Sequence, residues 1–314
     1  MQKLPATPGT LPEYAQLLRA GGLVAIPTET VYGLAADASN SEAVLSIYET
    51  KGRPRFNPLI VHCASLDMAE TLAEFSPLAR QLAAFWPGPL TLVLPRRPDA
   101  PLSPLVTAGL DTVAIRVPGH KLALELIELV GRPLAAPSAN PSGRLSPTTA
   151  GQVVEGFGGR VPVLDGGPCP AGVESTILRV DGEAVIQLRA GALPRAEIEA
   201  LIGREVSDPA AGGPVLAPGM LSSHYAPHAR VRLGAAAPGP GEAYLAFGHC
   251  SLDAGGPVRN LSPAGDLREA ARNLFSMLRE LDASGAQTIA VAPIPSTGLG
   301  EAINDRLLRA AAPR

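Results

Sequence analysis

Strand-like and helix-like patterns alternate along the first 205 residues, and this alternation restricts the fold more than any other feature of the sequence. Short apolar runs typical of buried strands are separated by helical patterns, and they lie at 23–27, 58–62, 90–95, 112–118 and 133–137. Two further strand patterns flank Asp181-Gly182, a dipeptide suited to a type I′ hairpin turn. We therefore expect an α/β fold with a sheet of mixed strand direction.

Capping residues mark where several helices begin. Thr10 is placed to cap a first helix, and a second is expected to begin at Ser41. Residues 28–38, between the first strand and the second helix, are interpreted as a loop. Ser146 followed by Pro147 predicts another helix start, because serine caps free N–H groups and proline is tolerated in the first turn.

The chain changes character after its first 205 residues. Residues 206–229 are rich in proline, glycine, alanine and serine, which predicts a linker without regular structure. A strand–helix–strand–helix pattern follows, and its long helix has a capping-type start at Asp266 and Glu269. We therefore predict an α/β domain over 1–205, a linker and lid over 206–229, and a smaller Rossmann-like α/β domain over 230–314.

Composition narrows the function before any motif is considered. Only 4% of the 314 residues are aromatic and the formal net charge is −3, which argues against a general nucleic-acid-binding surface. The three cysteines, Cys63, Cys169 and Cys250, form no C-x-x-C pair, so neither a disulfide framework nor a thiolate zinc site is indicated. No apolar run approaches the roughly 20 residues that span a bilayer, so we expect a cytoplasmic protein.

Three cations nevertheless gather in "KGRPRFNP", residues 51–58. Pro54 and Pro58 predict a non-helical segment in which Lys51 and Arg53 point the same way. An arginine fork binds two phosphate oxygens and a lysine adds a compact charge, so the pair is suited to clamp a phosphate chain. Taken alone, the three cations are explained better as a solvated charge run.

Other polar side chains stand near strand ends, where α/β folds commonly bind ligands. The "PSANPSG" loop offers Ser138 and Asn140 to phosphate or ribose, and Ser146 follows at the expected helix start. Thr30 and His62 adjoin apolar strands and are suited to hold the hydroxyl and carboxylate of an amino acid. A lone histidine is more often structural, so His62 carries weight only together with the other residues.

Arg116 lies within a strand pattern and alternates away from its apolar side chains. Its charge therefore needs an anion if that face is covered. A substrate carboxylate is one candidate, and an ion pair with an acid such as Glu174 or Asp111 is the structural alternative.

The linker supplies a further candidate. His224 and His228 are four residues apart, but Pro227 argues against the helix that would make them a metal site. Tyr225 is placed to cover a nucleotide base, with the linker acting as a lid. Neither a G-x-x-x-x-G-K-[ST] loop nor a G-x-G-x-x-G fingerprint is present in the sequence, so standard nucleotide motifs are disfavoured.

Several long motifs together resemble the YrdC-type domain of threonylcarbamoyl-AMP synthases: "PTETVYGLAADA", "KGRPRFNPLIVH", "FWPGPLTLVLP", "PSANPSGRLSPTTA" and "GVESTIL". "APGMLSSHYAPHARV" is similar to the linker of the two-domain form. The resemblance implies a YrdC-like mixed, twisted sheet with helices. It also implies that L-threonine, bicarbonate and ATP, with Mg²⁺ carried by ATP, give L-threonylcarbamoyladenylate, pyrophosphate and water. A partner transferase would then use the product to modify adenosine 37 of tRNA, without stable nucleic-acid binding by this chain.

The resemblance also implies the ligand sets, and it gives Lys51 and Arg53 a catalytic role. No metal ligand from a protein side chain is implied. ATP is expected to meet Lys51, Arg53, Asn57, Thr112, Ser138, Asn140, Ser146, Arg189 and Tyr225. L-Threonine is expected to meet Thr30, His62, Arg116 and Ser175.

The sequence departs from the family pattern in two places, and two other functions stay open. Ala135-Ala136 stands where the family commonly offers a threonine, and "QLRAGA" stands where "RPGA" is expected, with Arg189 kept in register. The alternatives are an RNA-binding module and a carbamoyl-phosphate-dependent carbamoyltransferase of related fold. Dependence of pyrophosphate release on threonine and bicarbonate separates them from the synthase.

Overall fold

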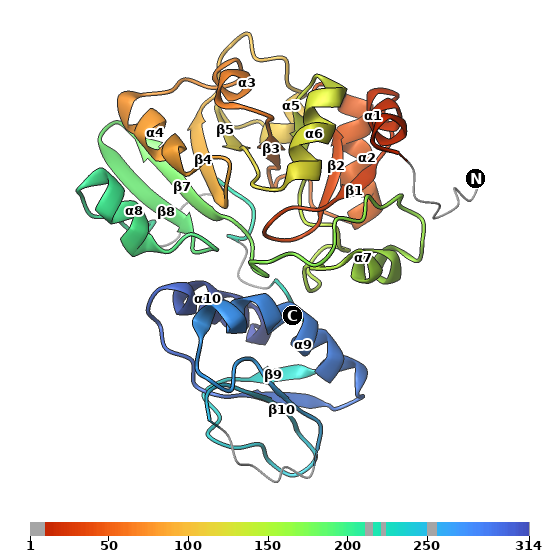
Figure 1. The fold of residues 1–314 in the computed structure, drawn as a ribbon, viewed down its shortest axis with the longest axis vertical. Helices are drawn as coiled ribbons and strands as arrows, with labels where there is room; N and C mark the ends of the chain where they lie inside the picture. The colour runs from red at the N-terminus through yellow and green to blue at the C-terminus, as the bar shows by residue number, and fades with distance from the viewer. Residues whose placement is uncertain (1–9, 211–215, 221–223, 250–255, 314) are drawn as a thin grey trace.

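The computed structural model describes residues 10–210, 216–220, 224–249 and 256–313. These residues form a large mixed sheet and a smaller parallel one, each with helices, so the predicted α/β class is confirmed. Helices α9 (Leu267–Ala283) and α10 (Leu299–Ala311) lie between the smaller sheet and the first domain (Figure 1).

The first sheet is eight-stranded and mixed in direction, as predicted. Its order is β1-β2-β6-β3-β5-β4-β7-β8, in which the pairs β3–β5 and β4–β7 are parallel and the other neighbours are antiparallel. The hairpin expected at Asp181-Gly182 joins the last two strands. The strands are β1 (Val24–Ile26), β2 (Gly33–Asp37), β3 (Ile60–His62), β4 (Leu90–Pro95), β5 (Thr112–Arg116), β6 (Leu134–Ala135), β7 (Thr176–Asp181) and β8 (Ala184–Arg189).

Short polar side chains cap the helices that connect these strands. Asn40 accepts hydrogen bonds from the backbone N–H groups of Glu42 and Ala43, and Ser76 accepts one from Ala79. The helices are α1 (Leu11–Arg19), α2 (Ser41–Lys51), α3 (Leu66–Glu70), α4 (Pro77–Leu82), the 3₁₀ turn η1 (Ala83–Phe85), α5 (Pro104–Thr107), α6 (Lys121–Val130), α7 (Ala150–Phe157) and α8 (Arg195–Ile202).

The loop predicted over residues 28–38 is wrong in its second half, where β2 pairs with β1. Every residue of β2 is buried, with Leu34 and Ala36 in the main core and Ala35 in the cluster under α1 and α6. A strand covered on both faces lacks the apolar–polar alternation that marks a half-buried strand, so the pattern did not predict it.

The predicted geometry of the cation segment is also wrong. Lys51 is the last residue of α2, which ends at Gly52 with φ 61°, in the left-handed conformation that favours glycine. Lys51 and Arg53 therefore do not alternate along one extended segment, and the helix end and the turn after it set their directions.

The helix start predicted at Ser146 is wrong as well. Helix α7 begins at Ala150, and the hydroxyl of Thr149 caps it by accepting from the N–H of Gln152. Ser146 instead donates its hydroxyl hydrogen to Glu174 at 2.5 Å. A buried carboxylate needs donors, and this requirement takes the hydroxyl away from any capping role.

The smaller sheet is parallel, in the order β11-β10-β12-β9. Its strands are β9 (Arg230–Arg232), β10 (Ala243–Ala246), β11 (Val258–Asn260) and β12 (Thr288–Val291). Helices α9 and α10 cover one face, whereas the described residues against the other face belong to strands and loops. A Rossmann domain carries helices on both faces, so the Rossmann-like detail is not confirmed.

The two domains share an apolar cluster. Val31, Leu145 and Val173 of the first domain pack in the same cluster as Leu274 and Phe275 of α9. The predicted domain boundaries stay a prediction, because parts of the linker, residues 211–215 and 221–223, lie outside the described residues, as does Cys250. In the described part of the chain, no helix is long and apolar enough to cross a membrane.

Candidate active site

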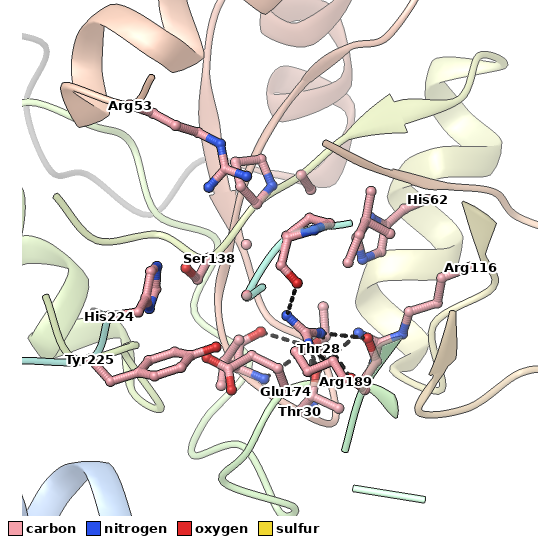
Figure 2. A pocket seen from close by; sticks show the side chains of 18 residues that line it. Thr28, Thr30, Arg53, His62, Arg116, Ser138, Glu174, Arg189, His224 and Tyr225 are labelled. Atoms are coloured by element: carbon pink, nitrogen blue, oxygen red, sulfur yellow. Dashed lines mark hydrogen bonds between the residues drawn. The ribbon is translucent and has the colours of Figure 1, made fainter. Parts of the chain in front are cut away.

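A cavity lies on the face of the first sheet that points away from the main core. Ile60 and His62 on β3 and Arg116 on β5 alternate onto this face. The turn after β1, the loop after β6 and the segment before β7 form its walls, and linker residues 216–220 and 224–225 lie over it (Figure 2).

Lys51 and Arg53 approach one side of the cavity and are bonded to backbone carbonyls. Lys51 Nζ donates to the carbonyl oxygens of Ser138, at 2.5 Å, and Asn140. Arg53 Nε donates to the carbonyl oxygen of Asn57 at 3.2 Å. Neither cation forms an ion pair with a carboxylate of the described residues, although both are buried.

Burial shapes the electrostatics of this side. It lowers the pKa of Lys51 well below its usual value, and the neighbouring Arg53 charge lowers it further. Burial likewise lowers the pKa of Arg53 to about 10. Two buried cations without a counter-charge form an electrostatically unsatisfied site, which an anion would stabilise.

Arg116 defines another side, where the charge is already compensated. Its Nη2 lies 2.6 Å from Glu29 Oε1, and its Nη1 donates to Thr30 Oγ1 at 3.0 Å. Arg116 therefore forms an ion pair, as the structural alternative expected, but its partner is Glu29 and neither Glu174 nor Asp111. The turn after β1 brings Glu29 to the end of β5, and spacing in the sequence does not encode that approach.

His62 is buried beside Arg116, as its register partner across β3 and β5. Burial first, and then the Arg116 charge, lower the pKa of His62 to about 3, so the ring is neutral near pH 7. Its Nδ1 has no hydrogen-bond partner among the described residues. A neutral ring with a free nitrogen offers a hydrogen bond to a ligand.

The segment before β7 and the end of β8 form the next wall (Figure 2). Arg189 Nη2 donates to the Ser175 carbonyl at 2.8 Å and to its hydroxyl oxygen at 3.1 Å. The Ser175 hydroxyl also lies 2.8 Å from the hydroxyl of Thr91. These contacts hold Ser175 and Arg189 as one unit, next to the buried carboxylate of Glu174.

The linker places two aromatic rings over the cavity (Figure 2). The rings of His224 and Tyr225 meet edge to face with centroids 4.1 Å apart. Tyr225 has φ 58° and is 1% exposed, and its ring centroid lies 5.5 Å from that of Phe275 on α9. A non-glycine residue in this conformation is held by its surroundings, and here they include the second domain.

The structure brings most of the predicted residues together. Those that line the cavity are Thr30, Arg53, His62, Arg116, Ser138, Ser175, Arg189 and Tyr225. Four others bond to lining residues or to the loop that carries them, namely Lys51, Asn57, Asn140 and Ser146. Thr112 begins β5, four residues before Arg116, and does not line the cavity. The ligand roles of all these residues stay predictions.

Sequence reasoning missed three polar side chains that line the cavity: Thr28, Glu174 as a wall residue, and His224. Thr28 sits two residues before Thr30 in the same motif, and its hydroxyl oxygen lies 2.8 Å from that of Thr30. Each of the three lies one or two residues from a residue that the sequence analysis assigned to the site, and this closeness was the signal that could have found it. Among the described residues, no group of three or more histidine, cysteine, aspartate or glutamate side chains could hold a metal ion.

The fold and the site together define an α/β protein with a cavity on its sheet that is lined by buried arginines. Comparison with known proteins names the family. A family model described as "Telomere recombination" (Sua5, YciO and YrdC) matches residues 16–191, and one described as "Threonylcarbamoyl-AMP synthase, C-terminal domain" matches residues 193–312. The chain belongs to the threonylcarbamoyl-AMP synthase family, and the predicted enzyme class is confirmed.

Relatives from distant organisms cover nearly the whole chain. The threonylcarbamoyl-AMP synthase of Pyrococcus abyssi is 44% identical over 94% of this chain and 92% of its own length, and that of Bacillus subtilis is 42% identical over 96% and 92%. A crystal structure of P. abyssi Sua5 complexed with L-threonine superposes with a TM-score of 0.88 at 42% identity, covering 96% of this chain and 94% of that one.

Proposed function

We propose that the cavity binds ATP and L-threonine side by side and joins them, with bicarbonate, into L-threonylcarbamoyladenylate, releasing pyrophosphate and water. The observation that carries the proposal is one cavity with two kinds of wall. Arg53 lines one wall, with Lys51 bonded behind it to the carbonyls of Ser138 and Asn140, and neither cation has a carboxylate partner among the described residues. Arg116, Thr30 and His62 form a compensated polar wall. The L-threonine complex of the P. abyssi relative supports the amino acid as a ligand.

ATP is assigned to the cationic wall. Arg53 and Lys51 would neutralise charge that develops on the leaving pyrophosphate, and this makes them the catalytic residues. Ser138, Asn140, Ser146 and Arg189 are proposed to hold the phosphates and ribose, with Asn57 and Thr112 beside the nucleotide. Tyr225 would cover the base from the linker, where it lies over the cavity.

L-Threonine is assigned to the wall around Arg116. The guanidinium would take the carboxylate, because a planar fork matches two carboxylate oxygens. Thr30, Ser175 and the unpartnered Nδ1 of His62 are available for the hydroxyl and amine. The neutral state of His62 favours this role, since a charged ring would repel the ammonium form of the amino acid.

The chemistry follows from position and charge. The threonine amine attacks CO₂ derived from bicarbonate to form a carbamate, and a carbamate oxygen then attacks the α-phosphate of ATP and displaces pyrophosphate. The cavity would align the reacting groups and exclude water. Mg²⁺ is proposed to arrive with the triphosphate, whose charge it screens. The product would pass to a cytoplasmic transferase for modification of adenosine 37 in tRNA.

The test is pyrophosphate release with each substrate omitted in turn. We expect release to require ATP, L-threonine and bicarbonate together. Release without threonine would contradict the assignment, and activity with carbamoyl phosphate in place of bicarbonate would instead indicate a carbamoyltransferase. Salt-dependent RNA binding without any pyrophosphate release would indicate the RNA-binding alternative.

A further inference from the structure

An arginine of the second domain reaches the wall of the cavity. Arg306 lies on α10 and is 0% exposed. Its Nε donates to Glu174 Oε2 at 2.7 Å, and its guanidinium carbon lies 5.1 Å from the centroid of the Tyr225 ring. Asp305, the preceding residue, also pairs with it. Arg306 thus contacts both a wall residue and the lid residue of the cavity.

Glu174 is an unexpected residue at a site for a polyanion. Burial alone would raise its pKa, but Arg306, Arg189 and the hydrogen bond from Ser146 lower it to about 2, so the carboxylate is ionised. An ionised carboxylate beside a triphosphate would repel it unless a cation neutralises the carboxylate. Arg306 supplies that charge from the second domain.

The segment that contains Glu174 also makes a direct backbone contact with the second domain. Gly172 has φ 75°, and a Cβ added there would lie 2.3 Å from the Cα of Arg272 on α9. The helix backbone therefore docks onto Gly172, two residues before Glu174 and three before Ser175. Because Ser175 is bonded to Arg189, the placement of the second domain is transmitted to two proposed ligand contacts.

We propose that Arg306 is a positioning residue through which the second domain shapes the ATP wall, by neutralising Glu174 and seating the Tyr225 ring. The inference rests on the proposed function and assigns the second domain a part in it. Arg306 does not touch the reacting atoms. It keeps the wall carboxylate compatible with phosphate and holds the lid ring over the base.

The experiment measures KM for ATP and for L-threonine separately in the full-length chain. In Arg306→Met we expect KM for ATP to rise at least about tenfold, because an unpaired buried carboxylate then faces the phosphates, while KM for threonine changes less. Adding Glu174→Gln should recover most of the loss, since the repelling charge is gone. A merely structural role for Arg306 predicts no such recovery.

Arg309→Met is the matched control. Arg309 lies one turn further along α10 and pairs with Asp305 at 2.9 Å, and its side chain does not line the cavity. Its kinetics should match the wild type. If Arg306→Met does not fold, Arg306→Lys keeps the charge and loses the planar contact with Tyr225, and an intermediate rise in KM for ATP is expected.

The outcomes separate the inference from the proposed function. A wild-type chain without threonine-dependent pyrophosphate release overturns the proposed function and, with it, the inference. An active wild type in which Arg306→Met or Arg306→Lys leaves KM for ATP unchanged, or in which Glu174→Gln gives no recovery, overturns the inference alone.

Discussion

The two walls of the cavity differ in how their charges are satisfied before a ligand binds. Arg116 is paired with Glu29, so its wall is close to neutral. Lys51 and Arg53 meet only carbonyl oxygens, which carry partial charges, so their wall keeps a net positive charge. The neutral wall suits an amino acid, whose own net charge is zero, and the positive wall suits a polyphosphate.

The unpaired cations mark the part of the cavity where the enzyme can stabilise a transition state. A cation that is already paired gains little further stabilisation when negative charge develops nearby during the reaction, whereas an unsatisfied buried cation gains most. We therefore expect changes on the Lys51 and Arg53 wall to act on the rate, and changes on the Arg116 wall to act on threonine binding.

The largest effect is expected at Arg53. Arg53→Ala should lower kcat at least about tenfold, because it removes a donor that faces developing charge. Arg55→Ala is the matched control, since Arg55 lies two residues away in the same segment but is exposed. Steady-state pyrophosphate release measures both variants, and equal rates for the two would remove Arg53 from the site.

A change at Arg116 should affect KM for L-threonine more than kcat. Arg116→Lys keeps the charge but loses the planar fork that matches a carboxylate. We expect KM for L-threonine to rise about tenfold while KM for ATP changes less than about twofold, an estimate from the loss of one charge-assisted bond. A rise in both constants would show that the two walls are not independent.

A smaller difference is expected between the two linker rings. Tyr225→Ala should raise KM for ATP several-fold, because Tyr225 is seated by Phe275 and Arg306 and lies over the cavity. His224→Ala should matter less, although His224 also lines the cavity. ATP binding measured by calorimetry compares the two variants, and a larger loss in His224→Ala would overturn the lid assignment.

The smallest effect concerns pH. The pKa values of His62 and His224 are both lowered to about 3, chiefly by burial. At these two rings the folded state binds fewer protons than the unfolded one. The stabilisation that their neutral form provides is therefore fully present above about pH 6.5 and is lost as the pH falls toward 3. Each ring should contribute about 1 kcal/mol of destabilisation between pH 7 and 5.5.

Denaturant unfolding at these two pH values, with wild type and His62→Asn, measures the contribution of one ring. The free energy of unfolding of the variant should change with pH by about half of the amount that the two rings together produce in the wild type. Glu174 adds little between pH 7 and 5.5, because its stabilising contribution is lost only as the pH falls from its ordinary pKa of 4.5 toward about 2. An unchanged pH dependence would show that His62 is not buried in the neutral form.

Local patterns accounted for much of the fold and for the membership of the site. The strand pattern at 90–95 coincides with β4, and the helix expected to begin at Ser41 is α2, because each pattern lies in contiguous side chains. The buried β2 escaped detection because burial on both faces removes the alternation. Ser146 was misread because its partner, Glu174, is 28 residues away.

Residue types and short spacings were enough to predict the polar motifs, most of the helices and strands, and the family. Which charges are paired depends instead on the folded arrangement. Glu29 meets Arg116 and Arg306 meets Glu174 across 87 and 132 positions of the chain. An ion pair depends on distance in space, and the packing of the sheet, the linker and the second domain sets that distance.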